Sequence, residues 1–146
     1  MTRLLFLISY VYTFPLYFYW KFLLLLKHNG SIMFKEDLDY RYRSNSYCKG
    51  FFSLMYYVKP YRNLYYKRCG ALSNLFRILV PLDSTFQIDG KVMPLGKCVW
   101  FEHSFRTIVH AKSIGNYFKI WHNCTIGSKN GKLPTIGDNV TILVMR

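Results

Sequence analysis

The stretch from Leu95 to Val140, LGKCVWFEHSFRTIVHAKSIGNYFKIWHNCTIGSKNGKLPTIGDNV, decides the fold. Large apolar residues recur along it and just beyond it mostly in steps of six. These positions are Leu95, Phe101, Ile108, Ile114, Ile120, Ile126, Ile136 and Ile142. An amphipathic helix repeats its buried face every 3.6 residues and a half-buried strand every second residue. Neither period explains steps of six.

Glycine and small apolar residues follow the same period. Glycine comes directly after the aliphatic residue at Gly96, Gly115, Gly127 and Gly137. Val99, Cys124 and Val140 each lie four positions past their aliphatic residue. This hexapeptide spacing is typical of a parallel β-helix, in which three short strands form one triangular coil. We expect the aliphatic side chains to point inward and glycine to relieve crowding at the corners.

The period divides the C-terminal part into coils. Residues 89–107 form a first coil with one extra residue, 108–125 a second, and a third begins at Ile126. Residues 128–134, SKNGKLP, are expected to form a loop pushed out from one corner. We therefore predict an α+β protein, in which an α-helical N-terminal part is followed by a short parallel β-helix over residues 85–146.

The N-terminal segment 1–32 is expected to be an apolar helix. Leu4 to Trp20 carries no charge, and FLLLL follows Lys21. Its length is near that of a membrane span, but Pro15 and Lys21 interrupt it. The segment could insert in a membrane, lie on its surface, pack in a protein core, or precede a true start at Met33. If it inserts, the basic residues that follow place the remainder in the cytoplasm.

Residues 33–84 are predicted to be α-helical. One helix is expected around residues 51–58, and another carries an apolar stripe made of Leu72, Leu75, Phe76, Leu79 and Val80. Between them, YRNLYYKRCG interleaves aromatic residues with Arg62, Lys67 and Arg68. That pattern occurs in nucleic-acid binding. No nucleic-acid module frames it, so we expect a solvated basic face over aromatic packing and no nucleic-acid partner.

Composition narrows the class of protein. The 146 residues suit one ordinary domain, and 51% hydrophobic against 18% charged residues excludes intrinsic disorder. The net charge of +13 favours anionic partners. The four cysteines show neither metal-ligand nor disulfide spacing, so we expect reduced thiols and no metal site.

Local strings within the repeats make the resemblance more specific. Glu102-His103 is followed by TIVHAKSIG, then by NCTIG, and then by a glycine-containing loop closed by PTIGDNV. In this order they resemble the hexapeptide-repeat acyltransferases, and within them the serine acetyltransferase-like branch. The resemblance covers about a third of the chain. It implies a left-handed β-helix, acetyl-CoA as acyl donor without a metal, and direct transfer of the acetyl group to a hydroxyl.

The resemblance also implies roles for individual residues. His103 matches the family's catalytic histidine, which acts as general base on the acceptor hydroxyl. The supporting carboxylate comes from the preceding coil, where Asp89 is the nearest candidate, one residue off the family spacing. Glu102 matches the acidic residue before the histidine, although strand alternation would point it to the opposite side. His110 is a further candidate for the same cleft, whereas His122 is expected at the surface or in packing.

The donor side and the assembly follow from the resemblance as well. Lys129, Gly131 and Lys132 in the loop could meet the phosphates of coenzyme A. The family forms homotrimers with the active site between subunits, and its later coils carry much of the coenzyme A site. No later coil follows Arg146, so the β-helix is expected to be incomplete at its C-terminus.

Three functions remain open from the sequence. The first is an acetyl-CoA-dependent O-acetyltransferase acting on L-serine or another small hydroxyl compound, in the cytoplasm. The second is O-acetylation of a cell-surface saccharide or its precursor, with the apolar N-terminal half holding the enzyme at the inner membrane face. The third is an inactive, truncated family member.

Overall fold

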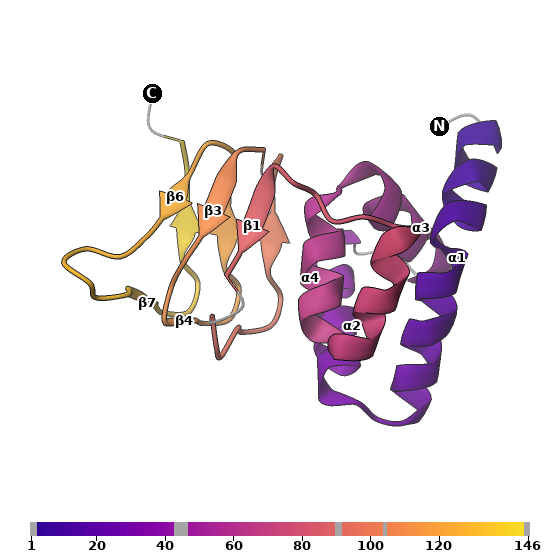
Figure 1. Cartoon of the computed structure of the whole chain (residues 1–146), viewed down its shortest axis with the longest axis horizontal. Coiled ribbons are helices and arrows are strands. Elements are labelled where there is room, and N and C mark those ends of the chain that lie inside the picture. The colour runs from indigo at the N-terminus through magenta and orange to yellow at the C-terminus, as the bar shows by residue number, and fades with distance from the viewer. Residues whose placement is uncertain (1–2, 43–46, 90–91, 104, 145–146) are drawn as a thin grey trace. The chain divides into compact units, whose positions relative to one another are not determined.

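The computed structural model describes residues 3–42, 47–89, 92–103 and 105–144. The chain forms two compact units, Met1–Leu82 and Asp83–Arg146 (Figure 1). The first contains the helices, and the second contains short parallel strands in small sheets. The prediction of a mixed α+β protein is therefore confirmed.

In the described ranges, the helical unit contains four α-helices and one 3₁₀-helix. They are α1 (Arg3–Leu25), α2 (Asn29–Tyr42), α3 (Tyr47–Tyr57), α4 (Pro60–Arg68) and the 3₁₀-helix η1 (Ala71–Ile78). Their core is aromatic: the Trp20 and Phe51 rings stack at 5.3 Å, and Phe34 and Tyr65 meet edge to face at 5.3 Å. Burial of rings in such edge and stacked geometries stabilises this unit.

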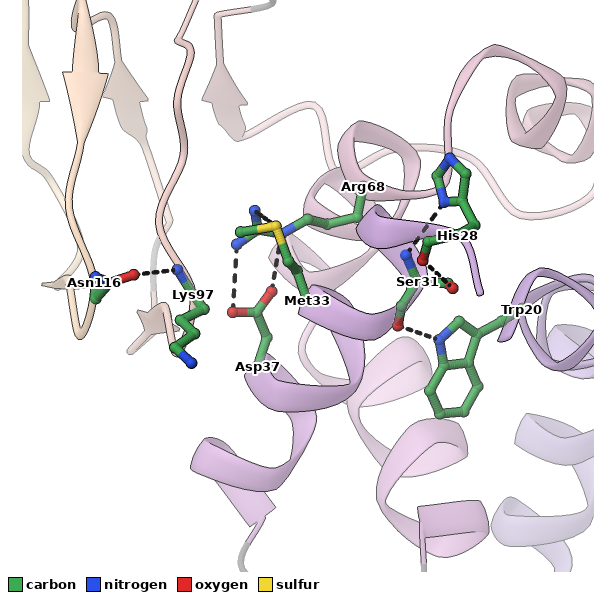
Figure 2. Close-up of polar contacts among 8 residues, drawn as sticks. All are labelled: Trp20, His28, Ser31, Met33, Asp37, Arg68, Lys97 and Asn116. Atoms are coloured by element: carbon green, nitrogen blue, oxygen red, sulfur yellow. Dashed lines mark hydrogen bonds and ion pairs between the residues drawn. The ribbon is translucent and has the colours of Figure 1, made fainter. Parts of the chain in front are cut away.

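Helix α1 is apolar on both of its faces. Leu16, Trp20 and Leu23 are buried on the inner face. The Trp20 indole Nε1 donates to the Ser31 carbonyl on α2 at 3.0 Å (Figure 2). Val11 and Phe18, on the outer face, are 75% and 68% exposed. Within the described ranges, none of the helices combines the length and the apolar character that crossing a membrane requires.

Two arginines of the basic-aromatic stretch are buried. Arg68 forms an ion pair with Asp37 of α2, with 3.1 Å between Nε and Oδ2 (Figure 2). Arg62 donates from Nη2 to the Tyr56 carbonyl at 3.3 Å and from Nη1 to the Pro81 carbonyl at 3.4 Å. The prediction of a solvated basic face is therefore wrong for these residues, because each guanidinium donates hydrogen bonds to carboxylate or carbonyl oxygens inside the protein.

The predicted apolar stripe near residue 75 does not face the core. The segment is a 3₁₀-helix, whose three-residue turn places Leu72, Leu75 and Ile78 along one ridge. That ridge is exposed, and Ile78 is 91% exposed. Val80 is the stripe residue that is fully buried. The stripe was predicted for an α-helix with 3.6 residues per turn, which the chain does not form here.

Among the residues that the structure describes, the second unit has eight short strands. They are β1 (Phe86–Ile88), β2 (Trp100–Phe101), β3 (Thr107–Val109), β4 (Ser113–Ile114), β5 (Lys119–Ile120), β6 (Thr125–Ile126), β7 (Thr135–Ile136) and β8 (Thr141–Ile142). The first sheet has the order β1-β3-β6, the second β2-β5-β8, and the third pairs β4 with β7 (Figure 1). All these pairs are parallel, and Leu95 bridges to Ile114 of β4. Along the chain, successive strands therefore belong to the first, third and second sheet in turn, and this order repeats.

Most of the six-residue positions point inward, as predicted. Leu95, Phe101, Ile114, Ile120 and Ile126 are buried. Ile108 is an exception and is 45% exposed, because in β3 its neighbours Thr107 and Val109 face the interior. Thr107 lies six residues after Phe101, and its hydroxyl donates to the Trp121 carbonyl at 3.1 Å. A shift of one residue along a strand moves a side chain to the opposite face of the sheet. Because the inward residue here is the polar Thr107, the apolar pattern of the sequence did not reveal the register of β3.

The corners of this unit are tightly packed. An added Cβ at Gly96 would lie 2.2 Å from the Gly115 carbonyl oxygen, which explains the glycine there. Asn116 Oδ1 accepts from the Lys97 amide at 3.0 Å, as Figure 2 shows. The Asn116 amide in turn donates to Asp138 Oδ1 at 2.6 Å. Side-chain acceptors therefore link successive corners.

Candidate functional site

His103 lies two residues past the end of β2, with its side chain open to solvent. The imidazole is 82% exposed, and its Nε2 lies 3.4 Å from Glu102 Oε1. The other carboxylate oxygen of Glu102 accepts from the Trp100 indole Nε1. Strand alternation was expected to separate Glu102 from His103. Both residues lie beyond the end of β2, and His103 has a positive φ of 47°, so the alternation of a strand does not hold here.

Asp89 forms its ion pair with a different histidine. Asp89 follows β1 and His110 follows the paired strand β3, and Asp89 Oδ2 lies 3.0 Å from His110 Nε2. The side chains are 30% and 41% exposed. Among the described residues, Glu102 and His103 thus form one carboxylate–histidine pair, and Asp89 and His110 form another. They follow strands of different sheets, because His103 follows β2.

A third histidine follows the strand next to β2. Phe101 of β2 pairs with Ile120 of β5, so His103 and His122 each lie two residues past paired positions. The Nδ1 atom of His122 is buried without a hydrogen-bond partner in the described part of the chain. Sequence reasoning assigned His122 to surface or packing and favoured His110 as the neighbour of His103. The position of His122 relative to His103 follows from the register of β2 and β5, which the sequence pattern did not provide.

The predicted coenzyme A residues lie in an exposed turn. Lys129 and Lys132 form an antiparallel bridge, with the Lys129 amide donating to the Lys132 carbonyl at 3.1 Å. Asn130 and Gly131 between them have φ of 51° and 73°. Asn-Gly with two positive φ angles is the favoured tip of a two-residue hairpin. Both lysine side chains are exposed, so they could meet an anionic ligand.

The buried thiol of the helical unit is a poor candidate nucleophile. Cys69, directly after α4, is 2% exposed, and burial raises its pKa to about 12. The thiolate is the reactive form of cysteine, and Cys69 does not reach it near neutral pH. All four cysteines are free thiols. Within the described residues, no group of three or more His, Cys, Asp or Glu could hold a metal ion.

The candidate site thus consists of two solvent-accessible imidazoles, each next to a carboxylate. An exposed basic turn belongs to the same unit. A histidine with a carboxylate on one ring nitrogen can accept a proton on the other. No family model matches the chain, and neither a curated protein nor a solved structure matches it.

Proposed function

We propose that the chain is an acetyl-CoA-dependent O-acetyltransferase with His103 as general base. The observation that carries the proposal is the contact between His103 Nε2 and Glu102 Oε1, at the end of a strand in a hexapeptide-spaced unit. With Glu102 accepting from Nε2, the Nδ1 atom is left to take the proton of the acceptor hydroxyl. The oxygen then attacks the thioester carbonyl, and coenzyme A leaves as the thiol.

The fold proposal supports the assignment. We interpret the three sheets as the faces of a parallel β-helix, because the chain visits them in rotation and pairs in parallel at each return. The left hand of this helix is what the resemblance to the family implies. The resemblance to hexapeptide-repeat acyltransferases rests on the strings around His103. Such enzymes work as trimers and meet acetyl-CoA in the cytoplasm, and we extend both properties to this chain.

Glu102 and Trp100 have supporting roles in this proposal. A carboxylate next to the imidazole stabilises the imidazolium that forms when the acceptor loses its proton. The Trp100 indole holds the second oxygen of the carboxylate, so Glu102 is oriented before the substrate binds. Lys129 and Lys132 would bind the phosphates of coenzyme A from the exposed turn.

Thiol release from acetyl-CoA tests the proposal, with L-serine, a saccharide acceptor or no acceptor present. We expect acceptor-dependent release, and we expect His103→Ala to lower it by roughly 10²- to 10⁴-fold, which is the usual contribution of a general base. His28→Ala is the matched control, because His28 lies in the helical unit. Release only with the saccharide identifies a glycan acceptor.

His110→Ala separates the two carboxylate–histidine pairs. If His110→Ala abolishes release and His103→Ala does not, Asp89 and His110 form the catalytic pair and the assignment to His103 is wrong. If the folded protein releases no thiol with any acceptor, the acetyltransferase proposal itself fails.

A further inference from the structure

The helical unit exposes two apolar ridges on elements that pack together. The first ridge, on α1, consists of Val11, Phe14, Phe18, Phe22 and Leu25, all between 44% and 82% exposed. The second, on η1, consists of Leu72, Leu75 and Ile78. Tyr19 of α1 contacts Phe76 of η1 with 5.4 Å between ring centroids, which joins the two elements. We call these two ridges the α1–η1 surface.

This surface is too apolar for ordinary solvent contact. Scattered single apolar residues are common on protein surfaces, whereas contiguous apolar ridges mark binding sites. The spacing along α1 is three or four residues, which places the whole ridge on one helical face. Its opposite face, with Leu16 and Trp20, already packs in the core. A helix that is apolar all round needs an apolar environment for its outer face in addition to the protein core.

A pocket hollows the surface where α1 meets η1. Its volume is about 370 Å³ and its lining residues are Pro15, Phe18, Tyr19, Phe22 and Phe76. The lining is almost entirely hydrocarbon and aromatic. Such a pocket suits an acyl chain, because it offers burial without demanding hydrogen bonds.

The charges next to the surface are basic. Lys21, Lys27 and Arg77 are exposed and lie on or beside α1 and η1. The acidic residues among positions 1–82 are Glu36, Asp37 and Asp39, all on α2, and Asp37 is buried against Arg68. The sequence of α1 and of η1 contains no carboxylate side chain.

Charge decides between two occupants of the surface. A second copy of the chain would bring the same lysines and arginine against themselves, with no carboxylate on α1 or η1 to compensate. An anionic lipid surface supplies the opposite charge and an apolar layer beneath it. We propose that the α1–η1 surface docks the protein on an anionic membrane, with the pocket accepting an acyl chain from the bilayer.

Binding of the full chain to vesicles tests this inference. Phosphatidylcholine vesicles with and without 30% phosphatidylserine (roughly the anionic fraction that attracts basic surfaces) are sedimented with the protein. We expect binding to the anionic vesicles that falls with added salt. Phe18→Glu and Ile78→Glu should each weaken it at least about tenfold, and Lys21→Gln about fivefold.

Matched variants in the other unit serve as controls. Met93 is 67% exposed, so Met93→Glu repeats the change at similar exposure outside the surface. Lys112→Gln repeats the loss of charge. Ile78→Glu lies on η1, so it keeps the test valid if Phe18→Glu prevents α1 from packing, which circular dichroism reports. Equal binding by all variants, or no binding to anionic vesicles, overturns the inference.

Self-association is measured in the same samples by sedimentation velocity. If Phe18→Glu and Ile78→Glu dissociate an oligomer and vesicle binding is absent, the surface is an interface between copies and the membrane inference is wrong. Thiol release from acetyl-CoA plays no part in these readouts, so this inference can fail while the acetyltransferase proposal stands.

Discussion

Gly115 shows how closely the corners of the β unit approach one another. An added Cβ there would lie 2.3 Å from Asp138 Oδ1 and 2.6 Å from the Gly137 carbonyl carbon. Gly127 follows its isoleucine in the same way, but no heavy atom of the described chain lies within 4 Å of an added Cβ. Equivalent positions in the sequence repeat therefore differ in how much space they have.

The first prediction compares these two glycines. Gly115→Ala should lower the free energy of unfolding by about 1–3 kcal/mol, because the methyl group forces the corner apart. Gly127→Ala should change it by less than about 0.5 kcal/mol. Urea titration followed by tryptophan fluorescence measures both. Equal losses in the two variants would contradict the corner packing described here.

The second prediction concerns the buried ion pair of the helical unit. Asp37 is fully buried and Arg68 nearly so, and the guanidinium meets both carboxylate oxygens, with a second contact of 3.5 Å from Nη2 to Oδ1. Asp37→Asn should cost about 3–5 kcal/mol, because it leaves an uncompensated buried charge. Thermal denaturation measures the loss.

A double variant separates the pair from its surroundings. Asp37→Leu combined with Arg68→Met removes both charges, and it should recover much of the stability that Asp37→Asn loses. If the double variant is less stable than the single one, the two side chains have further structural roles that outweigh their mutual contact.

Among the helices, α3 depends on a residue outside it. Arg62 of α4 donates to the Tyr56 carbonyl in the last turn of α3 and to the Pro81 carbonyl beyond η1. The last four carbonyls of a helix have no partner within the helix. A buried guanidinium on α4 therefore takes the place of a glycine cap at this end of α3.

The third prediction removes that cap. Arg62→Met should lower the free energy of unfolding by about 1–3 kcal/mol, because buried carbonyls lose their donors. Arg77→Met is the matched control. The Arg62 guanidinium lies 5.6 Å from the Tyr12 ring centroid, and Arg77 lies over a tyrosine ring in the same way, 5.3 Å from the Tyr66 centroid, but is exposed. Denaturant titration of the two variants side by side tests this. Similar losses in both would show that the stacking contact matters more than the carbonyls.

The elements differ in how well the sequence predicts them. The inward positions of β2, β4, β5 and β6 follow from the six-residue period, because parallel strands stacked at each return must bury equivalent positions. The period failed at Ile108, where the inward residue is Thr107. The helical period failed separately at η1, since a pattern of apolar residues does not say whether the protein itself covers them.

For the candidate site, the sequence identified the histidines and carboxylates but not their pairing. Asp89 was assigned to His103, and the structure pairs it with His110, because β1 lies beside β3. Glu102 was expected to point away from His103, but both residues lie beyond the end of β2 and their side chains meet at 3.4 Å. Pairing depends on strand register and on where each strand ends, and neither can be read from residue type.

At the scale of the whole molecule, ionisable groups in the helical core should make the folded state less stable at alkaline pH. Burial raises the pKa of Tyr65 and Tyr66, both on α4, above the ordinary value of 10.0. Burial also raises the pKa of the Cys69 thiol from 9.0 to about 12. Each group is neutral when protonated, so the folded protein favours the protonated form.

The fourth prediction follows from the sign of these shifts. The contribution of Cys69 is complete below pH 9 and is lost as the pH rises from 9 toward about 12, because the unfolded thiol ionises first. By pH 10 the free energy of unfolding should have fallen by about 1 kcal/mol from this group alone. Chemical denaturation at several pH values measures it. Cys69→Ala should show a smaller decline between pH 9 and 10, and an unchanged decline would contradict the assignment.

The exposed turn at residues 128–134 has a consequence for engineering. Ser113 pairs with Thr135 and Lys119 with Thr141, so the strands beyond the turn keep their parallel partners despite the added length. The extra residues close on themselves through Lys129 and Lys132. Foreign peptides inserted between Asn130 and Gly131 should therefore be displayed at the surface without disturbing the sheets, which makes this turn a ready attachment point for epitope tags or fluorescent labels.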